Sequence, residues 1–307
     1  LEKAAKAYPT KTAIAYGERE ITYAELNSLS SRFAAALLEL GIEKGERVAL
    51  FLPNIPQFVI AYYGILKAGA VLTAISPLHK EREVAYQLND AEAGTIVALD
   101  TLYPILANIR KETMLKHVIL TSMEEYAYKT ANTHRTNCET LNVHSFQILL
   151  EETSAEPPRV HINPEEDLAA LQYTGGTTGT AKGAMLTHLN LVSNAIAFAT
   201  WIKGTAEDTF LAALPLFHIY GMTTSMNVPI SLAAKIVLLP KFEPTAALEA
   251  IQRHKATVFC GVPTMYSLLL ANPMLGNCNL TSIRVCISGA SPLPLQIQKR
   301  FMEVTGG

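Results

Sequence analysis

The sequence is poor in features that would assign it to several common classes of protein. Lys and Arg number 25 and Asp and Glu number 27, so the net charge is only −2. Without an excess of positive charge there is no electrostatic reason to bind nucleic acid, and we expect no such partner. No CxxC pair and no metal-ligand spacing with histidine occurs among the four cysteines, which are Cys138, Cys260, Cys278 and Cys286. We therefore expect free thiols in a reducing compartment.

The sequence also lacks a long uninterrupted apolar run. The most apolar stretch, FVIAYYGILKAGAVLTAI at 58–75, contains Lys67 and two glycines, so we expect a helix, a turn and a strand rather than a membrane span. No charged-then-apolar leader opens the chain, which predicts no secretory signal. A cytoplasmic protein is the expectation. Peripheral contact with a membrane surface and the oligomeric state are left open.

Apolar strand-like segments alternate with helical patterns along the chain, and no internal repeat interrupts them. Predicted strands lie at 48–52, 71–75, 95–99, 117–121, 168–173, 209–214, 235–239, 257–260 and 283–288. Predicted helices lie near 26–40, 58–67, 81–90, 187–200, 244–254, 263–271 and 293–304. Continuous apolar strands bounded by helices favour parallel sheets covered on both faces. Because so many strands exceed one comfortable sheet, we predict an α/β protein with two packed doubly wound units.

Residues 173–183, YTGGTTGTAKG, leave the predicted strand 168–173 and precede a helix expected from about Thr187. Ligands of open α/β sheets bind at the carboxyl ends of strands, and glycines let backbone N–H groups approach an anion. The P-loop pattern GxxxxGK[ST] fails here because Ala181 and Gly183 stand at two required positions. The dinucleotide pattern GxGxxG fails because Gly175 and Gly176 are adjacent. A third kind of phosphate loop is indicated.

The stretch YTGGTTGTAKGAMLTH resembles the signature loop of the adenylate-forming superfamily, which includes acyl-CoA synthetases, luciferases and peptide-synthetase adenylation domains. The usual form is YTSGTTGxPKG, and this chain has Gly175 for the serine and Ala181 for the proline. Further resembling segments follow in the family's order: ITYAELN at 21–27, LKAGAVLTAISP at 66–77, LPLFHIYGM at 214–222, GVPTMY at 261–266 and ISGASPLP at 287–294.

The resemblance implies binding of ATP, Mg²⁺ and coenzyme A, with residues in defined roles. The β- and γ-phosphates would be held by Gly175, Gly176, Thr177, Thr178 and Gly179, with Lys182 neutralising charge. Thr174 would lie beside the α-phosphate and Mg²⁺, and Gly289, Ala290 and Ser291 would form a wall of the adenine pocket. The acyl channel would be lined by Tyr220, Met222, Gly261 and Val262, and His218 would position the substrate carboxylate.

Within the superfamily the chain looks most like bacterial-type medium- and long-chain fatty acid–CoA ligases. Amino-acid adenylating relatives place an aspartate just after the aromatic residue of the fourth motif, whereas here His218 follows Phe217 and offers no carboxylate for an ammonium group. Ile219, Tyr220 and Met222 beside it suit an apolar acid. The alternatives are an aryl-acid (coumarate-type) CoA ligase, a fatty-acyl-AMP ligase, and, from a different class, a non-catalytic nucleotide-binding pseudoenzyme.

The resemblance also predicts how the chain divides. Residues 52–198 would form one α/β subdomain, and 1–46 with 212–307 would form most of a second. The family's small β-barrel, its Mg²⁺-binding Glu, its ribose-binding Asp and a C-terminal domain with a catalytic Lys would lie outside these residues. We expect residues 1–307 alone to form little thioester from ATP, coenzyme A and palmitate.

Overall fold

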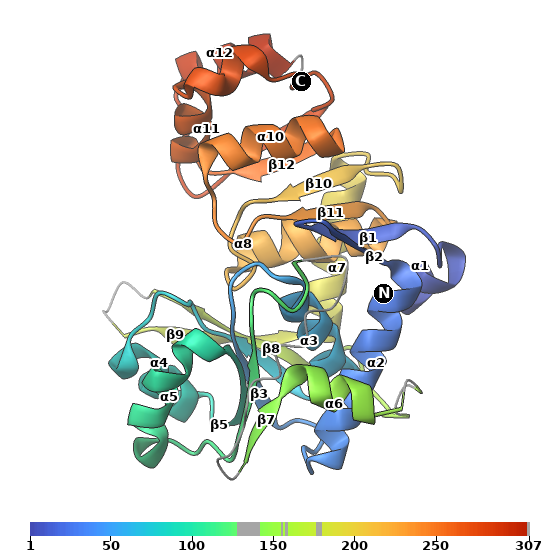
Figure 1. Ribbon diagram of the computed structural model, residues 1–307, viewed down its shortest axis with the longest axis vertical. Helices are drawn as coiled ribbons and strands as arrows, with labels where there is room; N and C mark the ends of the chain where they lie inside the picture. The colour runs from blue at the N-terminus through green and yellow to red at the C-terminus, as the bar shows by residue number, and fades with distance from the viewer. Residues whose placement is uncertain (128–141, 155, 157–158, 176–179, 306–307) are drawn as a thin grey trace. The chain divides into compact units, whose positions relative to one another are not determined.

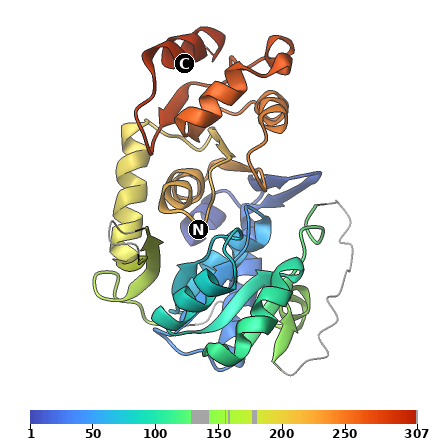
Figure 2. The same cartoon turned by 90° about the vertical axis from the view of Figure 1, so that its left-hand side faces the viewer.

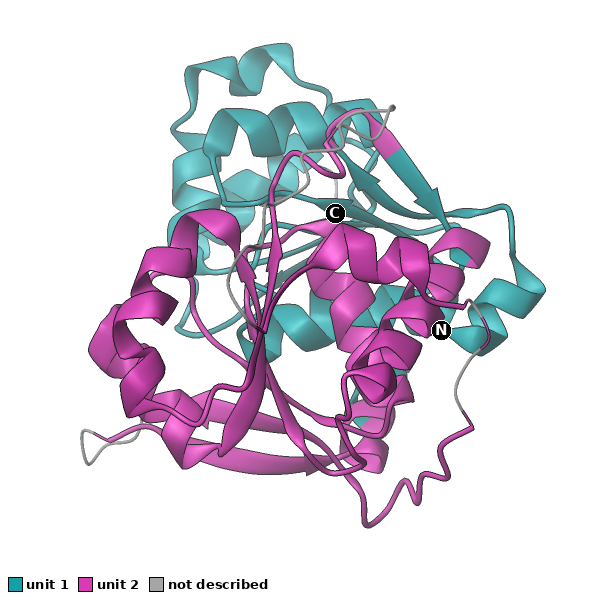
Figure 3. Ribbon diagram, turned by 60° about the horizontal axis from the view of Figure 1, so that its bottom comes forward, with its two compact units in different colours: residues 1–16, 20–23, 194–307 teal, residues 17–19, 24–193 magenta. Residues whose placement is uncertain are grey.

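The computed structural model describes residues 1–127, 142–154, 156, 159–175 and 180–305. Contacts divide the chain into two compact units, coloured separately in Figure 3: unit 1 comprises residues 1–16, 20–23 and 194–307, and unit 2 comprises 17–19 and 24–193. By these contacts residues 24–51 belong with unit 2, whereas the sequence analysis grouped residues 1–46 with 212–307. The division of the chain into folding domains stays a prediction.

Unit 2 contains a sheet whose strand order is β7-β6-β5-β3-β4-β8-β9 (Figure 1). The strands are β3 (Arg47–Phe51), β4 (Val71–Ala74), β5 (Ala93–Leu99), β6 (His117–Thr121), β7 (Val143–Ser145), β8 (Leu168–Thr174) and β9 (Lys182–Thr187). Neighbouring strands are parallel except β9, which runs antiparallel to β8 at the sheet edge.

Helices α2 (Tyr23–Glu39), α3 (Pro56–Lys67), α4 (Glu81–Asp90), α5 (Tyr103–Ile109) and α6 (Phe146–Glu152) accompany this sheet, with short 3₁₀ turns η1 (Asp100–Leu102) and η2 (Arg110–Glu112). The helix predicted at 81–90 is confirmed. Its polar face carries charges while Val84 and Leu88 are fully buried against the sheet core. Burial of that apolar face is what fixes α4 to the sheet.

Unit 1 contains a second sheet, with strand order β13-β12-β10-β11-β1-β2. The strands are β1 (Thr12–Tyr16), β2 (Arg19–Thr22), β10 (Thr209–Ala212), β11 (Lys235–Leu238), β12 (Val258–Gly261) and β13 (Val285–Ser288). Most of β2 lies in unit 1 with its partner β1. The contacts of β1, β10, β11, β12 and β13 along this order are parallel.

The helices of this part of the chain are α1 (Glu2–Ala7), α7 (His188–Trp201), α8 (Ile219–Gly221), α9 (Val228–Leu232), α10 (Pro244–His254), α11 (Pro263–Leu270) and α12 (Leu295–Thr305), with a π-helix, η3 (Met222–Asn227), and a 3₁₀ turn, η4 (Pro273–Asn277). Helices α10, α11 and α12, orange to red in Figure 2, pack on one another.

Both faces of the unit 1 sheet are covered, as the sequence predicted. Along a strand, successive side chains point to opposite faces. Phe210 belongs to one buried cluster and Leu211 to another, and Val258 and Phe259 divide in the same way. The confirmed fold class is therefore α/β with two sheets composed mainly of parallel strands.

The helix expected from about Thr187 is confirmed as α7, and the strand β9, which the sequence did not predict, lies directly before it. The segment Lys182–Thr187 is largely exposed and has no apolar alternation, so its sequence carries no strand pattern. It becomes a strand because β8 supplies hydrogen-bonding partners along its edge, from Thr174 opposite Lys182 to Ala170 opposite Leu186. Helix α7 starts only after it.

One buried carboxylate connects the starts of three neighbouring strands of unit 1. Asp208, directly before β10, has a side chain that is only 4% exposed. Its Oδ1 accepts from Thr257, before β12, at 2.6 Å and from Arg284 Nε, before β13, at 2.8 Å. Burial works against ionisation, but the hydrogen bonds from Arg284 and Thr257 outweigh it and lower the pKa of Asp208.

We predict that Asp208→Ala lowers the free energy of unfolding by about 2–3 kcal/mol, as measured in urea. Removing one partner of a buried pair costs about 3–5 kcal/mol, and the partial exposure of Arg284 to water reduces this. The pKa shift also has a pH signature: the contribution of Asp208 is full above the unfolded pKa of about 3.9 and disappears as the pH falls through the lower folded value.

Glu207→Ala is the matched control, because Glu207 is the adjacent residue and its side chain is 88% exposed in its pair with Lys11. Such exposed pairs contribute about 0–1 kcal/mol. Equal losses in the two variants would contradict the role assigned to Asp208.

Candidate active site

The glycine-rich connection joins β8 to β9 as a hairpin at the carboxyl end of β8. Thr174, the last residue of β8, pairs in register with Lys182, the first residue of β9. Both residues are exposed, and, its chain neighbours apart, none of the described residues has an atom within 4 Å of the place where a Cβ on Gly175 would stand. The structure thus brings together a hydroxyl, an open stretch of backbone and an ammonium group, a combination suited to an anion.

The four central residues of the predicted phosphate loop lie outside the described residues: Gly176, Thr177, Thr178 and Gly179. Their assigned contacts with the β- and γ-phosphates stay predictions. Lys182 has no carboxylate partner within the described part of the chain, so its charge is available to a ligand.

In unit 1 the other predicted residues gather where three parallel strands end. Tyr220 follows β10, Gly261 is the last residue of β12, and Gly289 follows β13. The Gly289 N–H donates to the Gly261 carbonyl at 3.0 Å, and the Tyr220 hydroxyl donates to the Ile287 carbonyl at 3.1 Å. The carboxyl edge of an α/β sheet is where ligands of such folds bind.

The position after β13 requires a residue without a side chain. A Cβ on Gly289 would stand 2.7 Å from the Tyr220 ring, so glycine allows the ring to lie against the backbone. Ala290 follows with φ of 69°, in the left-handed region, and turns the exposed Ala290 and Ser291 away from the strand. The predicted adenine wall is therefore a backbone surface bordered by an aromatic ring.

The surface after β13 has a buried polar atom of the kind expected beside a bound nucleotide. The Ser288 hydroxyl oxygen is buried and has no hydrogen-bond partner in the described residues. Such an orphaned polar atom beside an open backbone wall fits a site that a polar ligand completes.

His218 stands at the start of α8 with an exposed side chain. Its Nδ1 accepts from the Tyr220 backbone N–H at 3.2 Å. In the neutral ring this arrangement assigns the remaining proton to Nε2, which can donate a hydrogen bond to a carboxylate. The geometry supports positioning of an acid rather than removal of a proton from it.

The residues predicted to line the acyl channel differ in how deeply they are buried. Tyr220 and Val262 contact a buried apolar cluster that includes Phe210 and Val258. Met222, in contrast, is fully buried at the start of the π-helix η3. Such π-helical turns are frequent at functional sites, and this one begins beside Gly221, where a Cβ would stand 2.2 Å from the Pro215 carbonyl oxygen.

Thr174, Gly175 and Lys182 belong to unit 2, and the residues after β10, β12 and β13 belong to unit 1.

The sequence analysis did not identify Tyr86, Tyr173 or Ser288, which lie near the predicted site residues. No sequence pattern could have identified Tyr86, because it lies 95 residues before Ala181, to whose carbonyl its hydroxyl donates.

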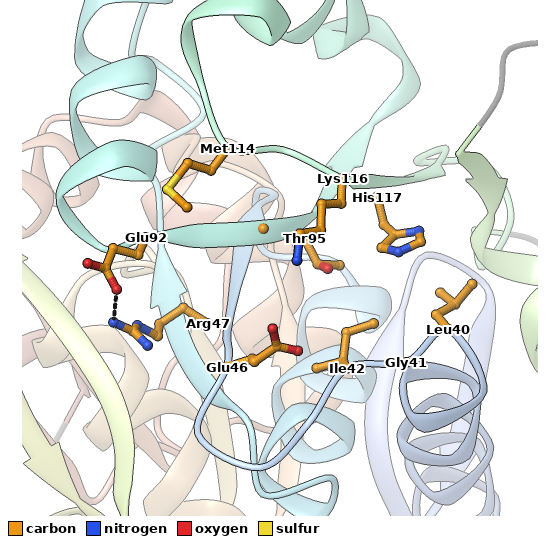
Figure 4. A pocket seen from close by; sticks show the side chains of 11 residues that line it. Leu40, Gly41, Ile42, Glu46, Arg47, Glu92, Thr95, Met114, Lys116 and His117 are labelled. Atoms are coloured by element: carbon orange, nitrogen blue, oxygen red, sulfur yellow. Dashed lines mark hydrogen bonds and ion pairs between the residues drawn. The ribbon is translucent and has the colours of Figure 1, made fainter.

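A separate cavity of about 330 Å³ lies at the opposite, amino edge of the unit 2 sheet (Figure 4). Arg47, Thr95 and His117, near the starts of β3, β5 and β6, line it, and Arg47 pairs there with Glu92. This cavity does not contain any predicted site residue.

No three histidine, cysteine, aspartate or glutamate side chains are grouped to hold a metal ion within the described ranges. None of the helices that the structure describes has both the length and the apolarity required to cross a bilayer.

The fold defines a class of α/β proteins with two mainly parallel sheets, in which a Gly/Thr/Lys connection leaves one sheet at the carboxyl end of β8. The sequence profile of the AMP-binding enzymes matches residues 1–307, and the chain belongs to that family of AMP-binding enzymes. The resemblance inferred from the motifs is confirmed.

Similar proteins of known sequence include a long-chain-fatty-acid–CoA ligase of Bacillus subtilis, 38% identical over 320 residues that cover 100% of this chain and 57% of the relative. A long-chain-fatty-acid–CoA ligase of Salmonella typhimurium is 32% identical and covers 99% of this chain and 57% of its own length. The chain thus spans a little over half the length of these relatives.

Similar solved structures include an anthranilate CoA ligase in complex with anthranoyl-AMP, with a TM-score of 0.88 and 27% identity, covering 99% of this chain and 57% of that one. A long-chain-fatty-acid-CoA ligase from Archaeoglobus fulgidus has a TM-score of 0.85 and 26% identity, covering 99% and 59%.

We predict that Gly289→Ala destabilises unit 1 by about 1–3 kcal/mol, since the added methyl group would overlap the Tyr220 ring and force a shift. Binding of AMP should weaken in parallel. Urea unfolding and equilibrium binding measure the two effects. Gly276→Ala is the control, because a Cβ there would meet no atom within 4 Å. Equal behaviour of the two variants would contradict the close contact of Tyr220 with the Gly289 backbone.

Proposed function

We propose that this chain supplies the ATP- and acid-binding part of an enzyme that activates a fatty acid to acyl-AMP and then to acyl-CoA. The observation that carries the proposal is the β8–β9 hairpin, with Thr174 opposite Lys182, in a chain matched over its whole length by the AMP-binding enzymes. The fatty-acid substrate follows from the names of the relatives in Bacillus and Salmonella.

In the first half-reaction a carboxylate oxygen forms a bond to the α-phosphorus of ATP, and the bond to pyrophosphate breaks. Two anions approach each other, so the protein must stabilise negative charge and align the reactants. Lys182 neutralises charge on the departing pyrophosphate. His218 Nε2 donates to the acid and orients it, which requires no proton removal because the carboxylate is already ionised at pH 7.

In the second half-reaction the thiolate sulfur of coenzyme A attacks the acyl carbon, and the bond to AMP breaks. The adenylate is the better electrophile because AMP leaves more readily than oxide. The wall after β13 retains AMP through both steps, with Gly289, Ala290 and Ser291 offering mainly backbone. Tyr220, Gly261 and Val262 would contact the acyl group, with Met222 buried behind them.

Mg²⁺ would neutralise phosphate charge when bound. The hydroxyl of Thr174 is the group of the described chain that we assign to it, and it is exposed beside the hairpin. A single hydroxyl fits a magnesium ion held largely by phosphates and water, which is the usual way Mg²⁺ binds in nucleotide sites.

We expect the protein to act in the cytoplasm on small molecules, namely a fatty acid, ATP and coenzyme A. Separate measurement of acyl-AMP and acyl-CoA distinguishes the fatty-acyl-AMP ligase and the pseudoenzyme: the first forms acyl-AMP but no acyl-CoA, and the second forms neither.

We predict that Lys182→Ala lowers acid-dependent exchange of pyrophosphate into ATP by about 10²–10³-fold in the protein that carries this chain, as loss of one charge-stabilising donor typically does. Lys241→Ala, at an exposed position of unit 1, should leave the exchange unchanged. Full exchange in Lys182→Ala would remove this residue from the mechanism.

The second candidate substrate is an aryl acid, which the similarity to the anthranilate CoA ligase favours. A panel of fatty acids of graded length and of cinnamic and benzoic acids separates the two. We expect the largest kcat/KM with a fatty acid, because the residues beside His218 are apolar and offer little to a polar ring substituent. A larger kcat/KM with an aryl acid would replace the fatty-acid assignment.

A further inference from the structure

Helix α4 contacts the β8–β9 hairpin at β8 and at the residue directly before β9, through two tyrosine hydroxyls. The Tyr86 hydroxyl, on α4, donates to the carbonyl of Ala181, the residue before Lys182, at 2.8 Å. The Tyr173 hydroxyl, on β8, donates to the Asp90 carboxylate, also on α4. Residues four apart lie on the same side of a helix, so one face of α4 holds both ends of the connection. Figure 1 shows α4 beside β9.

The Tyr173 ring also couples the two strands directly. Tyr173 pairs in register with Gly183, and a Cβ on Gly183 would stand 3.1 Å from the ring. Glycine at 183 therefore lets the ring cross β9 closely. Burial and the hydrogen bond to Asp90 raise the pKa of Tyr173, so its hydroxyl remains a proton donor at neutral pH.

Helix α4 is itself fixed to the sheet next to β8. Gln87 is 3% exposed, and its Nε2 donates to Thr73 Oγ1 at 2.9 Å and to the Ala74 carbonyl at 3.0 Å, both on β4. Because β4 is the parallel neighbour of β8, the helix, the two strands and the hairpin form one hydrogen-bonded assembly. Tyr86 and Asp90 are thus presented from a helix that is hydrogen-bonded to the sheet.

The contact at Ala181 restrains a residue whose φ is not fixed by a proline ring. The superfamily loop that this stretch resembles has proline at this position, and proline fixes φ. Alanine leaves that torsion free, so an external hydrogen bond to its carbonyl restricts the same residue by another route. Restriction of a binding segment before the ligand arrives favours binding, since less conformational freedom is then lost.

We propose that Tyr86 and Asp90 are positioning residues that set the orientation of Thr174 and Lys182 for the phosphates of ATP. The proposal rests on the proposed function for its ligand. Its structural part, the restriction of the hairpin by α4, does not.

The test uses four variants of the protein that carries this chain. Tyr86→Phe and Asp90→Ala each remove one contact, and Asp90→Asn keeps an oxygen that can accept from Tyr173. Tyr103→Phe is the matched control, because Tyr103 lies on α5 of the same unit and its hydroxyl has no hydrogen-bond partner among the described residues. Amide hydrogen exchange over residues 180–187 reports the hairpin, and pyrophosphate exchange gives KM for ATP and for the acid.

We expect faster amide exchange over 180–187 and a KM for ATP raised about three- to tenfold in Tyr86→Phe and Asp90→Ala, the range of one net hydrogen bond. The KM for the acid should stay constant, and Asp90→Asn should recover most of the loss. Unchanged amide exchange in both variants would overturn the restriction by α4. Faster exchange with an unchanged KM for ATP would overturn the positioning role. A wild-type protein with no pyrophosphate exchange would refute the proposed function, while amide exchange would still decide the role of α4.

Discussion

The Asp208 carboxylate holds the starts of β10, β12 and β13 in register, and much of the candidate site in unit 1 depends on that register. Strands of equal start and similar length end together, so their following segments meet at one edge. Gly261 and Gly289 then lie close enough for a 3.0 Å backbone hydrogen bond, and the Tyr220 hydroxyl reaches the Ile287 carbonyl. A carboxylate at the amino edge thereby contributes to the geometry of the opposite edge, where His218 and the residues predicted to form the adenine wall lie.

Close backbone approaches explain why glycine stands at particular positions of this edge. A side chain on Gly221 would overlap the Pro215 carbonyl, and one on Gly289 would overlap the Tyr220 ring. In unit 2, Gly183 leaves the same kind of room for the Tyr173 ring. These glycines let an aromatic ring or a carbonyl come within contact distance of their own backbone. Leaving room for a phosphate would be a different role. For Gly175, which has open space at its Cβ position among the described residues, the approach of a phosphate stays the prediction.

The candidate site residues of the two units are held in place in different ways. In unit 1 the site residues follow strands that parallel pairing has already aligned. In unit 2 the glycine-rich connection returns along an antiparallel edge strand, β9, so on one side of the hairpin none of the described strands restrains it. The hydroxyls of Tyr86 and Tyr173, together with Asp90, supply contacts from α4 instead. The cavity at the amino edge, lined by Arg47 and His117, takes no part in either arrangement.

The sequence by itself determined the α/β class, most strand and helix positions and the family. Apolar periodicity shows which faces are buried, so elements such as α4 and β6 could be predicted. The family could be recognised because the residues of the motif around Lys182 are close together in the chain. It did not predict β1, β2, β7 or β9. The first three are short or lie beside polar turns, and β9 is a strand only because β8 is its neighbour. The tertiary structure alone decided that Tyr86 meets Ala181 and that Asp208 joins Thr257 and Arg284, since contacts between residues far apart in sequence depend on packing, which no local pattern encodes.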